Sequence, residues 1–119
     1  MAGRGNLRPR VLLGELEPMV RVGMTRVLVD GGAEVLPEVG PEDGLVDRAA
    51  AERPDVVVLA EWAYALGDAV RRAAPAAKLI VWSSDETSMT VYDPGAAAPR
   101  RVSSAAPEAL VEELTGSAP

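Results

Sequence analysis

The chain has 119 residues, no cysteine and no histidine, which excludes disulfides, thiolate catalysis and thiolate zinc sites and removes the commonest general base. A formal net charge of −6 argues against a nucleic-acid groove as the main surface. The length suits a single domain with one core. No apolar run approaches the roughly 20 residues that cross a bilayer, and no apolar signal segment opens the chain, so we expect a cytoplasmic protein with no membrane partner.

Short apolar runs alternate along the chain with stripes of apolar residues at helical spacing. We expect a loose leader over 1–9, one domain over 10–116 and a tail over 117–119. Within the domain, apolar runs predict strands over 11–14, 33–37, 54–60, 78–82 and 101–103. Apolar residues three or four positions apart predict helices that begin at Pro18, Pro41, Trp62 and Pro107. The pattern fails over 85–100, where 91–95 is typical of a turn.

The run over 54–60 is the expected centre of the sheet. Its length and its β-branched content favour a strand that is buried on both faces. The alternation of strands and helices indicates parallel strands joined by right-handed crossovers, with helices on both faces. Ligand chemistry in such sheets gathers beyond the carboxyl ends of the strands. The residue at this tip is Ala60, whose methyl group neither accepts a phosphoryl group nor binds a metal.

Five segments carry a resemblance to a known family through their order and spacing. They are RVLL at 10–13, EPMVRVGM at 17–24, RPDVVVL at 53–59, KLIV at 78–81 and APEAL at 106–110. Together they resemble the receiver domain of bacterial two-component response regulators, nearest the subfamily often joined to a helix-turn-helix output. The resemblance implies a flavodoxin-like (CheY-like) three-layer α-β-α fold with a five-stranded parallel sheet of order 2-1-3-4-5. The fourth helix of that fold is expected to be shortened or missing here.

The phosphorylation pocket of the family is only partly kept in this chain. In the family, two acidic residues after the first strand hold Mg²⁺, and an aspartate at the tip of the third strand takes the phosphoryl group. A hydroxyl residue after the fourth strand and a lysine after the fifth bind the phosphoryl oxygens. The matching positions here are Glu15, Leu16, Ala60, Ser83 and Ser103, and the only lysine, Lys78, starts a different strand. The resemblance therefore implies a vacated phosphorylation pocket with no bound cofactor.

Three glutamates near the expected pocket allow more than one interpretation. Glu61 follows Ala60 and either mimics a phosphoaspartate or, because neighbouring strand residues point to opposite faces, caps the next helix. Glu15, Glu17 and Glu61 form either a divalent-cation site or a solvated acidic rim, and we favour the rim and expect no metal. Ser83 is either a remnant of phosphate binding or, more simply, satisfies a backbone group.

Aromatic and basic residues mark a second candidate surface. Two tryptophans near the expected pocket are flanked by two tyrosines: Trp62, Trp82, Tyr64 and Tyr92. These rings form either a partner or ligand surface or part of the core, and core filling is the simpler account of Trp82. Arg100 and Arg101 either hydrogen-bond a partner carboxylate or lie exposed on a turn. The full candidate surface comprises Glu17, Glu61, Trp62, Tyr64, Tyr92, Arg100 and Arg101.

These observations predict a phosphorylation-independent pseudo-receiver domain that acts in signalling or transcriptional regulation through a protein partner or through homodimerisation. The alternative is a small-molecule-responsive domain that uses the vacated pocket at Glu15, Ala60 and Ser83. We expect no enzyme, since no constellation in the chain combines a nucleophile with an activating base. We also expect no binding of nucleic acid by this domain itself.

Overall fold

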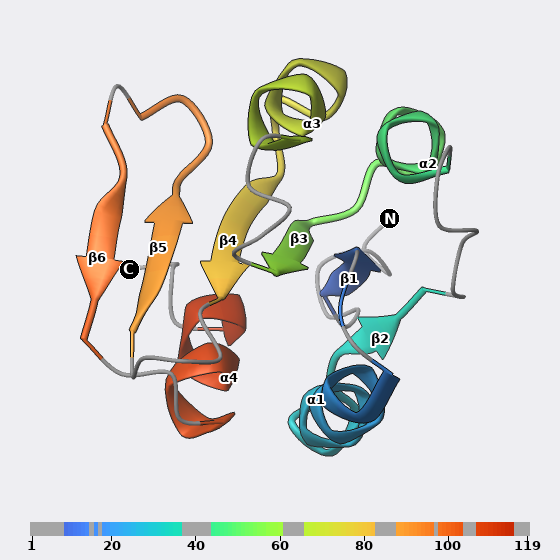
Figure 1. The fold of residues 1–119 in the computed structure, drawn as a ribbon, viewed down its shortest axis with the longest axis vertical. Coiled ribbons are helices and arrows are strands. Elements are labelled where there is room, and N and C mark those ends of the chain that lie inside the picture. The colour runs from blue at the N-terminus through green and yellow to red at the C-terminus, as the bar shows by residue number, and fades with distance from the viewer. Residues whose placement is uncertain are drawn as a thin grey trace, which may run out of the picture.

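The computed structural model describes residues 9–14, 16, 18–36, 44–60, 66–82, 88–96, 98–103 and 107–115. Over these ranges one sheet is covered by helices on both faces (Figure 1). Its strands are β1 (Arg10–Gly14), β2 (Glu34–Val35), β3 (Val56–Ala60), β4 (Lys78–Trp82), β5 (Met89–Tyr92) and β6 (Arg100–Val102). The helices are α1 (Pro18–Asp30), α2 (Leu45–Glu52), α3 (Gly67–Ala73) and α4 (Pro107–Thr115). No helix in these ranges is long and apolar enough to cross a membrane.

The sheet is mixed, with strand order β2-β1-β3-β4-β5-β6. The first four strands in this order are parallel, whereas β5 and β6 form an antiparallel hairpin beside β4. The predicted α/β class is confirmed, and the predicted order 2-1-3-4 agrees with the parallel strands. The predicted all-parallel, five-stranded sheet differs from the structure beyond β4. There an antiparallel strand takes the fifth place, and the strand predicted over 101–103 becomes the sixth.

The strand β5, which the sequence pattern does not predict, explains this difference. The segment over 91–95 was expected to be one turn, but β5 ends at Tyr92 and the turn begins only at Asp93. Met89 and Val91 are buried, and the residue after each is half-buried, which is the alternation of a strand with one well-covered face. Four residues give a pattern too short to recognise in the sequence. Pairing with β4, which comes earlier in the chain, decides the conformation.

The helices lie where the sequence predicts them as far as the structure describes them. α1 and α4 begin at Pro18 and Pro107, as expected. The predicted starts of the second and third helices, Pro41 and Trp62, lie outside the described residues, as do most of the leader and the whole tail. The described residues between β4 and β6 form β5, in the place where the family fold has its fourth helix.

Two glycines, Gly31 and Gly32, follow the end of α1. The amide of Gly32 donates to the carbonyl of Val29 (3.0 Å), and the amide of Ala33 donates to the carbonyl of Leu28 (2.9 Å). These bonds satisfy carbonyls that the helix end leaves free. Gly32 has a φ of 98°, which a residue with a Cβ adopts only with strain. The chain can therefore turn at once into β2.

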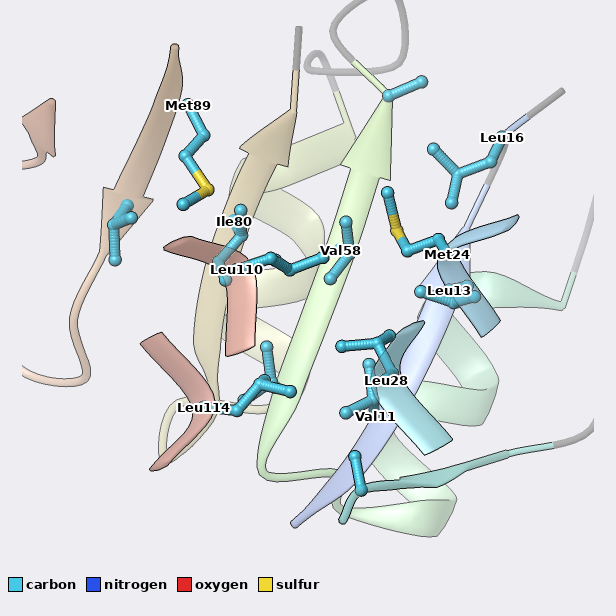
Figure 2. Packing of buried hydrophobic residues seen from close by; sticks show 14 residues of the cluster. Val11, Leu13, Leu16, Met24, Leu28, Val58, Ile80, Met89, Leu110 and Leu114 are labelled. Atoms are coloured by element: carbon cyan, nitrogen blue, oxygen red, sulfur yellow. The ribbon is translucent and has the colours of Figure 1, made fainter. Parts of the chain in front are cut away.

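Two apolar clusters hold the helices on the sheet, because α1 and α4 cover one face and α2 and α3 cover the other (Figure 1). The α1/α4 core comprises Val11, Leu13, Leu16, Met24, Leu28, Ala33, Val56, Val58, Ala60, Ile80, Met89, Val91, Leu110 and Leu114 (Figure 2). The α2/α3 core comprises Leu12, Leu36, Leu45, Ala49, Val57, Leu59, Val70, Ala74, Ala77 and Leu79. Every residue of β3 is buried, as predicted for a strand covered on both faces.

The pattern of burial in β5 can be tested with two neighbouring substitutions. We expect Val91→Ala to lower the free energy of unfolding by about 2 kcal/mol, because it removes two buried methyl groups and leaves a cavity. Thr90→Ala serves as the matched control and should change stability by less than about 0.5 kcal/mol, since its side chain is half-exposed. Urea denaturation measures both. Equal, small effects would mean that this segment is a solvated turn.

Candidate functional site

Apolar side chains fill the carboxyl edge of the parallel strands at two of the three described positions where the resemblance places phosphorylation chemistry. Leu16 follows β1 and Ala60 ends β3, and the two are only 9% and 8% exposed. Both belong to the α1/α4 core together with Met24. Figure 2 shows Leu16 and Met24 at this end of the sheet. A carboxylate in either place would lose its hydration, so the packing suits the hydrocarbon side chains that are present.

This edge therefore offers no metal ligand and no phosphoryl acceptor at Leu16 or Ala60. The remaining candidates at this edge lie outside the described residues: Glu15, Glu17, Glu61, Trp62, Tyr64 and Ser83. Among the residues that the structure does describe, no group of three or more acidic, histidine or cysteine residues is placed to hold a metal ion. The acidic-rim and cation-site interpretations of the three glutamates both remain expectations.

Ser103 does not take the lysine position that the resemblance implies. It is exposed and follows β6, which β5 separates from β4. In the expected sheet the strand before Ser103 would lie directly beside β4 and bring this residue to the pocket. Insertion of β5 moves it one strand further from Ala60. The antiparallel strand β5, which the sequence pattern did not reveal, therefore argues against the assignment of Ser103 to the pocket.

The two described aromatic residues are not brought together. Trp82 packs against the α1/α4 core, whereas Tyr92 packs against the α2/α3 core on the other face of the sheet. They also lie at opposite ends of β4, because Tyr92 pairs with Leu79 in the register and Trp82 ends the strand. The guanidinium of Arg71 lies 4.9 Å from the centre of the Tyr92 ring, a cation–π contact within the chain. A single aromatic surface containing both rings is excluded.

Arg100 and Arg101 begin β6 and do not lie on a turn. Arg100 is already engaged within the chain, since its guanidinium binds both oxygens of Asp93 (2.6 and 3.0 Å) and both oxygens of Glu113 (2.7 and 3.2 Å). Arg101 donates to the hydroxyl of Ser88 (3.3 Å). The carboxylates that Arg100 binds are therefore those of Asp93 and Glu113 in the same chain.

A charged cluster that the sequence did not predict lies at the opposite edge of the sheet. It consists of Lys78, Asp93, Arg100 and Glu113. Lys78 begins β4 and is only 5% exposed. Its ammonium group donates to the backbone carbonyl of Glu113 (2.7 Å) and to its carboxylate (3.2 Å), and lies 3.8 Å from Asp93. The cluster thus ties α4 to β4 and to the hairpin.

The electrostatics of the charged cluster follow from these contacts. Hydrogen bonds from Arg100 lower the pKa of Asp93 and the pKa of Glu113 below their ordinary values, and Lys78 adds to both effects. The same hydrogen bonds raise the pKa of Arg100. In the sequence, the signal for this cluster is Lys78 at the start of an apolar strand. Its carboxylate partner is 35 residues away, so spacing in the sequence could not identify the pair.

A hollow of about 290 Å³ opens between α1 and α4, next to the group around Leu16 and Ala60. It is lined by apolar residues, which are Met19, Val20, Gly23, Met24, Val27, Trp82 and Leu110. Met24 belongs to both the hollow and the group around Leu16 and Ala60. The sequence showed Val20, Met24 and Val27 as a helical stripe but did not show that part of the stripe would stay uncovered. Trp82 therefore lines an open surface as well as packing on the core.

The charged cluster predicts a specific dependence of stability on pH. At neutral pH we expect Glu113→Gln to lower the free energy of unfolding by about 2 kcal/mol, because hydrogen bonds between charged groups are lost. A lowered pKa in the folded state stabilises the fold above the ordinary carboxyl range, and this contribution disappears as the pH falls through the lowered pKa. The two proteins should therefore converge below the ordinary value of 4.5.

Urea denaturation at a series of pH values measures this convergence. Glu112→Gln is the matched control, since Glu112 is the exposed neighbour on α4 and should show little effect at any pH. A stability difference between Glu113→Gln and the parent that stays constant down to strongly acidic pH would contradict the role of the charged cluster.

Comparisons of the chain with protein-family models, with curated proteins and with solved structures each find no match. The function must therefore be argued from the residues and their arrangement. The arrangement has three described features: an apolar carboxyl edge, a satisfied charged cluster at the other edge, and an apolar hollow between α1 and α4.

Proposed function

We propose that the chain is a protein–protein interaction domain of the receiver type that works without phosphorylation, in signalling or transcriptional regulation. The observation that carries the proposal is the burial of Leu16 and Ala60 in one apolar core at the edge where a receiver would hold Mg²⁺ and a phosphoryl group. A phosphoryl switch needs charged oxygens and a cation at that place. The hydrocarbon side chains of Leu16 and Ala60 supply neither.

The topology supports the comparison with receivers. Four parallel strands of order 2-1-3-4, with helices on both faces, form the larger part of a flavodoxin-like sheet. The hairpin of β5 and β6 replaces the region that carries the fourth helix and the fifth strand in the family. A domain that has lost both the acceptor and part of the face that responds to it retains the scaffold. Such a scaffold can still present a surface to a protein partner, and that surface does not change with phosphorylation.

The alternative of a small molecule in the vacated pocket has less support. Leu16 and Ala60 occupy that place in the α1/α4 core, and the hollow lies beside it. The described lining of the hollow is apolar. Small-molecule sites usually add a few polar groups that orient the ligand, so the lining fits an apolar side chain of a protein better than a metabolite.

The absence of a phosphoryl switch can be tested by mass. After incubation with acetyl phosphate and Mg²⁺, we expect the intact mass of the protein to stay unchanged. Ala60→Asp should also remain unmodified and should be less stable, because the new carboxylate lies in an apolar core beside Leu16. A receiver domain with a complete pocket, treated in parallel, controls for the reagent. Phosphorylation of the unaltered chain would overturn the proposal.

A further inference from the structure

A second hollow opens at the amino edge of the sheet, away from the apolar carboxyl edge. It lies between the end of α3 and the turn that joins β5 to β6, and its volume is about 460 Å³. In Figure 1, α3 and this turn both lie at the top of the view. This polar hollow is lined by residues of both elements, which include Asp68, Arg71 and Arg72 from α3 and Asp93, Pro94 and Gly95 from the turn.

The turn that forms one wall of the polar hollow is fixed by its own residues. The amide of Ala96 donates to the carbonyl of Asp93 (3.1 Å), which closes a four-residue turn. Pro94 restricts its own φ, and Gly95 has a φ of 78°, which residues with a Cβ rarely adopt. Asp93 belongs to the charged cluster, so its carboxylate is already paired. This wall therefore has a defined shape and offers no unpaired carboxylate.

Arg71, on the opposite wall, is held in position from two directions. Its guanidinium lies over the ring of Tyr92, 4.9 Å from the ring centre, and it donates to the carbonyl of Ala96 (3.5 Å). Neither partner is charged, so neither neutralises the guanidinium. A guanidinium has five N–H donors in a planar fork, and stacking on a ring uses its face and leaves donors at its edge. Arg71 is therefore oriented for a further acceptor in the polar hollow.

Arg72 lies beside Arg71 in the last turn of α3 and lines the same hollow. It is exposed, and it makes no hydrogen bond or ion pair with any residue that the structure describes. Among the described lining residues, Asp68 is the only carboxylate outside the charged cluster. Two guanidinium groups therefore face one unpaired carboxylate. The polar hollow carries a surplus of positive charge on a chain whose formal net charge is −6.

We propose that the polar hollow binds an acidic segment of a protein partner, with Arg71 and Arg72 donating to its carboxylates. The inference rests on the proposed function, and it names the chemistry of the partner. The paired N–H donors of a guanidinium match the two oxygens of a carboxylate. A volume of about 460 Å³ is in the range of sites for molecules far larger than a single anion, so the carboxylates belong to a larger partner. Opposite charge steers such a segment to this face of an acidic chain.

Binding is measured by the fluorescence anisotropy of a labelled oligoglutamate peptide at low ionic strength. We expect saturable binding to the parent, and Arg72→Glu should raise the dissociation constant at least about tenfold, because it sets a carboxylate against the peptide. Arg26→Glu is the matched control, since Arg26 is exposed on α1, on the other face of the sheet, and it should bind like the parent. A parent that does not bind the peptide, or equal losses in both variants, overturns the proposal.

Two milder variants test the contact inside the polar hollow. Asp68→Asn should tighten binding of the peptide by about threefold, because it removes the carboxylate that opposes the ligand. Arg71→Lys keeps the charge but loses the planar fork that the Tyr92 ring orients, so it should weaken binding. An affinity that either variant leaves unchanged overturns the role of that residue.

Competition distinguishes an acidic segment from a small anion. Neither inorganic phosphate nor free glutamate should displace the peptide when present at the same concentration as the peptide. Displacement by either assigns the polar hollow to a small anion and overturns the proposed partner. The outcome is independent of the phosphorylation assay. A peptide that does not bind leaves the interaction domain standing with another partner, whereas a protein that acetyl phosphate modifies overturns the proposed function itself.

Discussion

Burial of β3 on both faces is the constraint on which the rest of the structure depends. Its five residues pair in parallel with β1 and β4, and all of their side chains are buried. Such a strand requires helices on both sides, so two apolar cores form and each helix is assigned to one of them. The parallel pairing also places the carboxyl ends of β1, β3 and β4 at one edge. The residues at that edge are therefore those at the carboxyl ends of these three strands and immediately after them.

Among the described residues, apolar side chains lie at the carboxyl ends of β1 and β3, and a charged cluster lies at the amino edge of the sheet. At the carboxyl edge, Leu16 and Ala60 are packed among hydrocarbon side chains. At the amino edge, the ammonium group of Lys78 is buried and held by Glu113 and Asp93. A buried cation is tolerated only with such partners, so the charged cluster serves the docking of α4 on the hairpin. The docked α4 then forms one wall of the hollow, and α1 forms the other.

Much of the fold could be predicted because its signals are local. All five expected strands and all four expected helices occur near their predicted positions, since period-two and helical patterns are properties of neighbouring residues. The strand β5 was missed because its four residues become a strand only by pairing with β4. That omission also hid the distance in the sheet between β4 and the strand that precedes Ser103. The sequence could not predict that Trp82 lines the hollow, because the hollow depends on how closely α1 and α4 approach each other.

The sequence by itself determined which chemistry is excluded. A chain without histidine or cysteine has no imidazole or thiolate chemistry in any conformation, and the side chains of Leu16 and Ala60 supply no oxygen for a cation or a phosphoryl group. Only the tertiary structure decided which groups meet. In the fold, Lys78 contacts Glu113, which is 35 residues away in the sequence. Tyr92 and Trp82 pack on opposite faces of the sheet, and Met19 and Val22 stay exposed. The reason is that side-chain identity is a property of each residue, whereas contact and exposure depend on the packing of the entire chain.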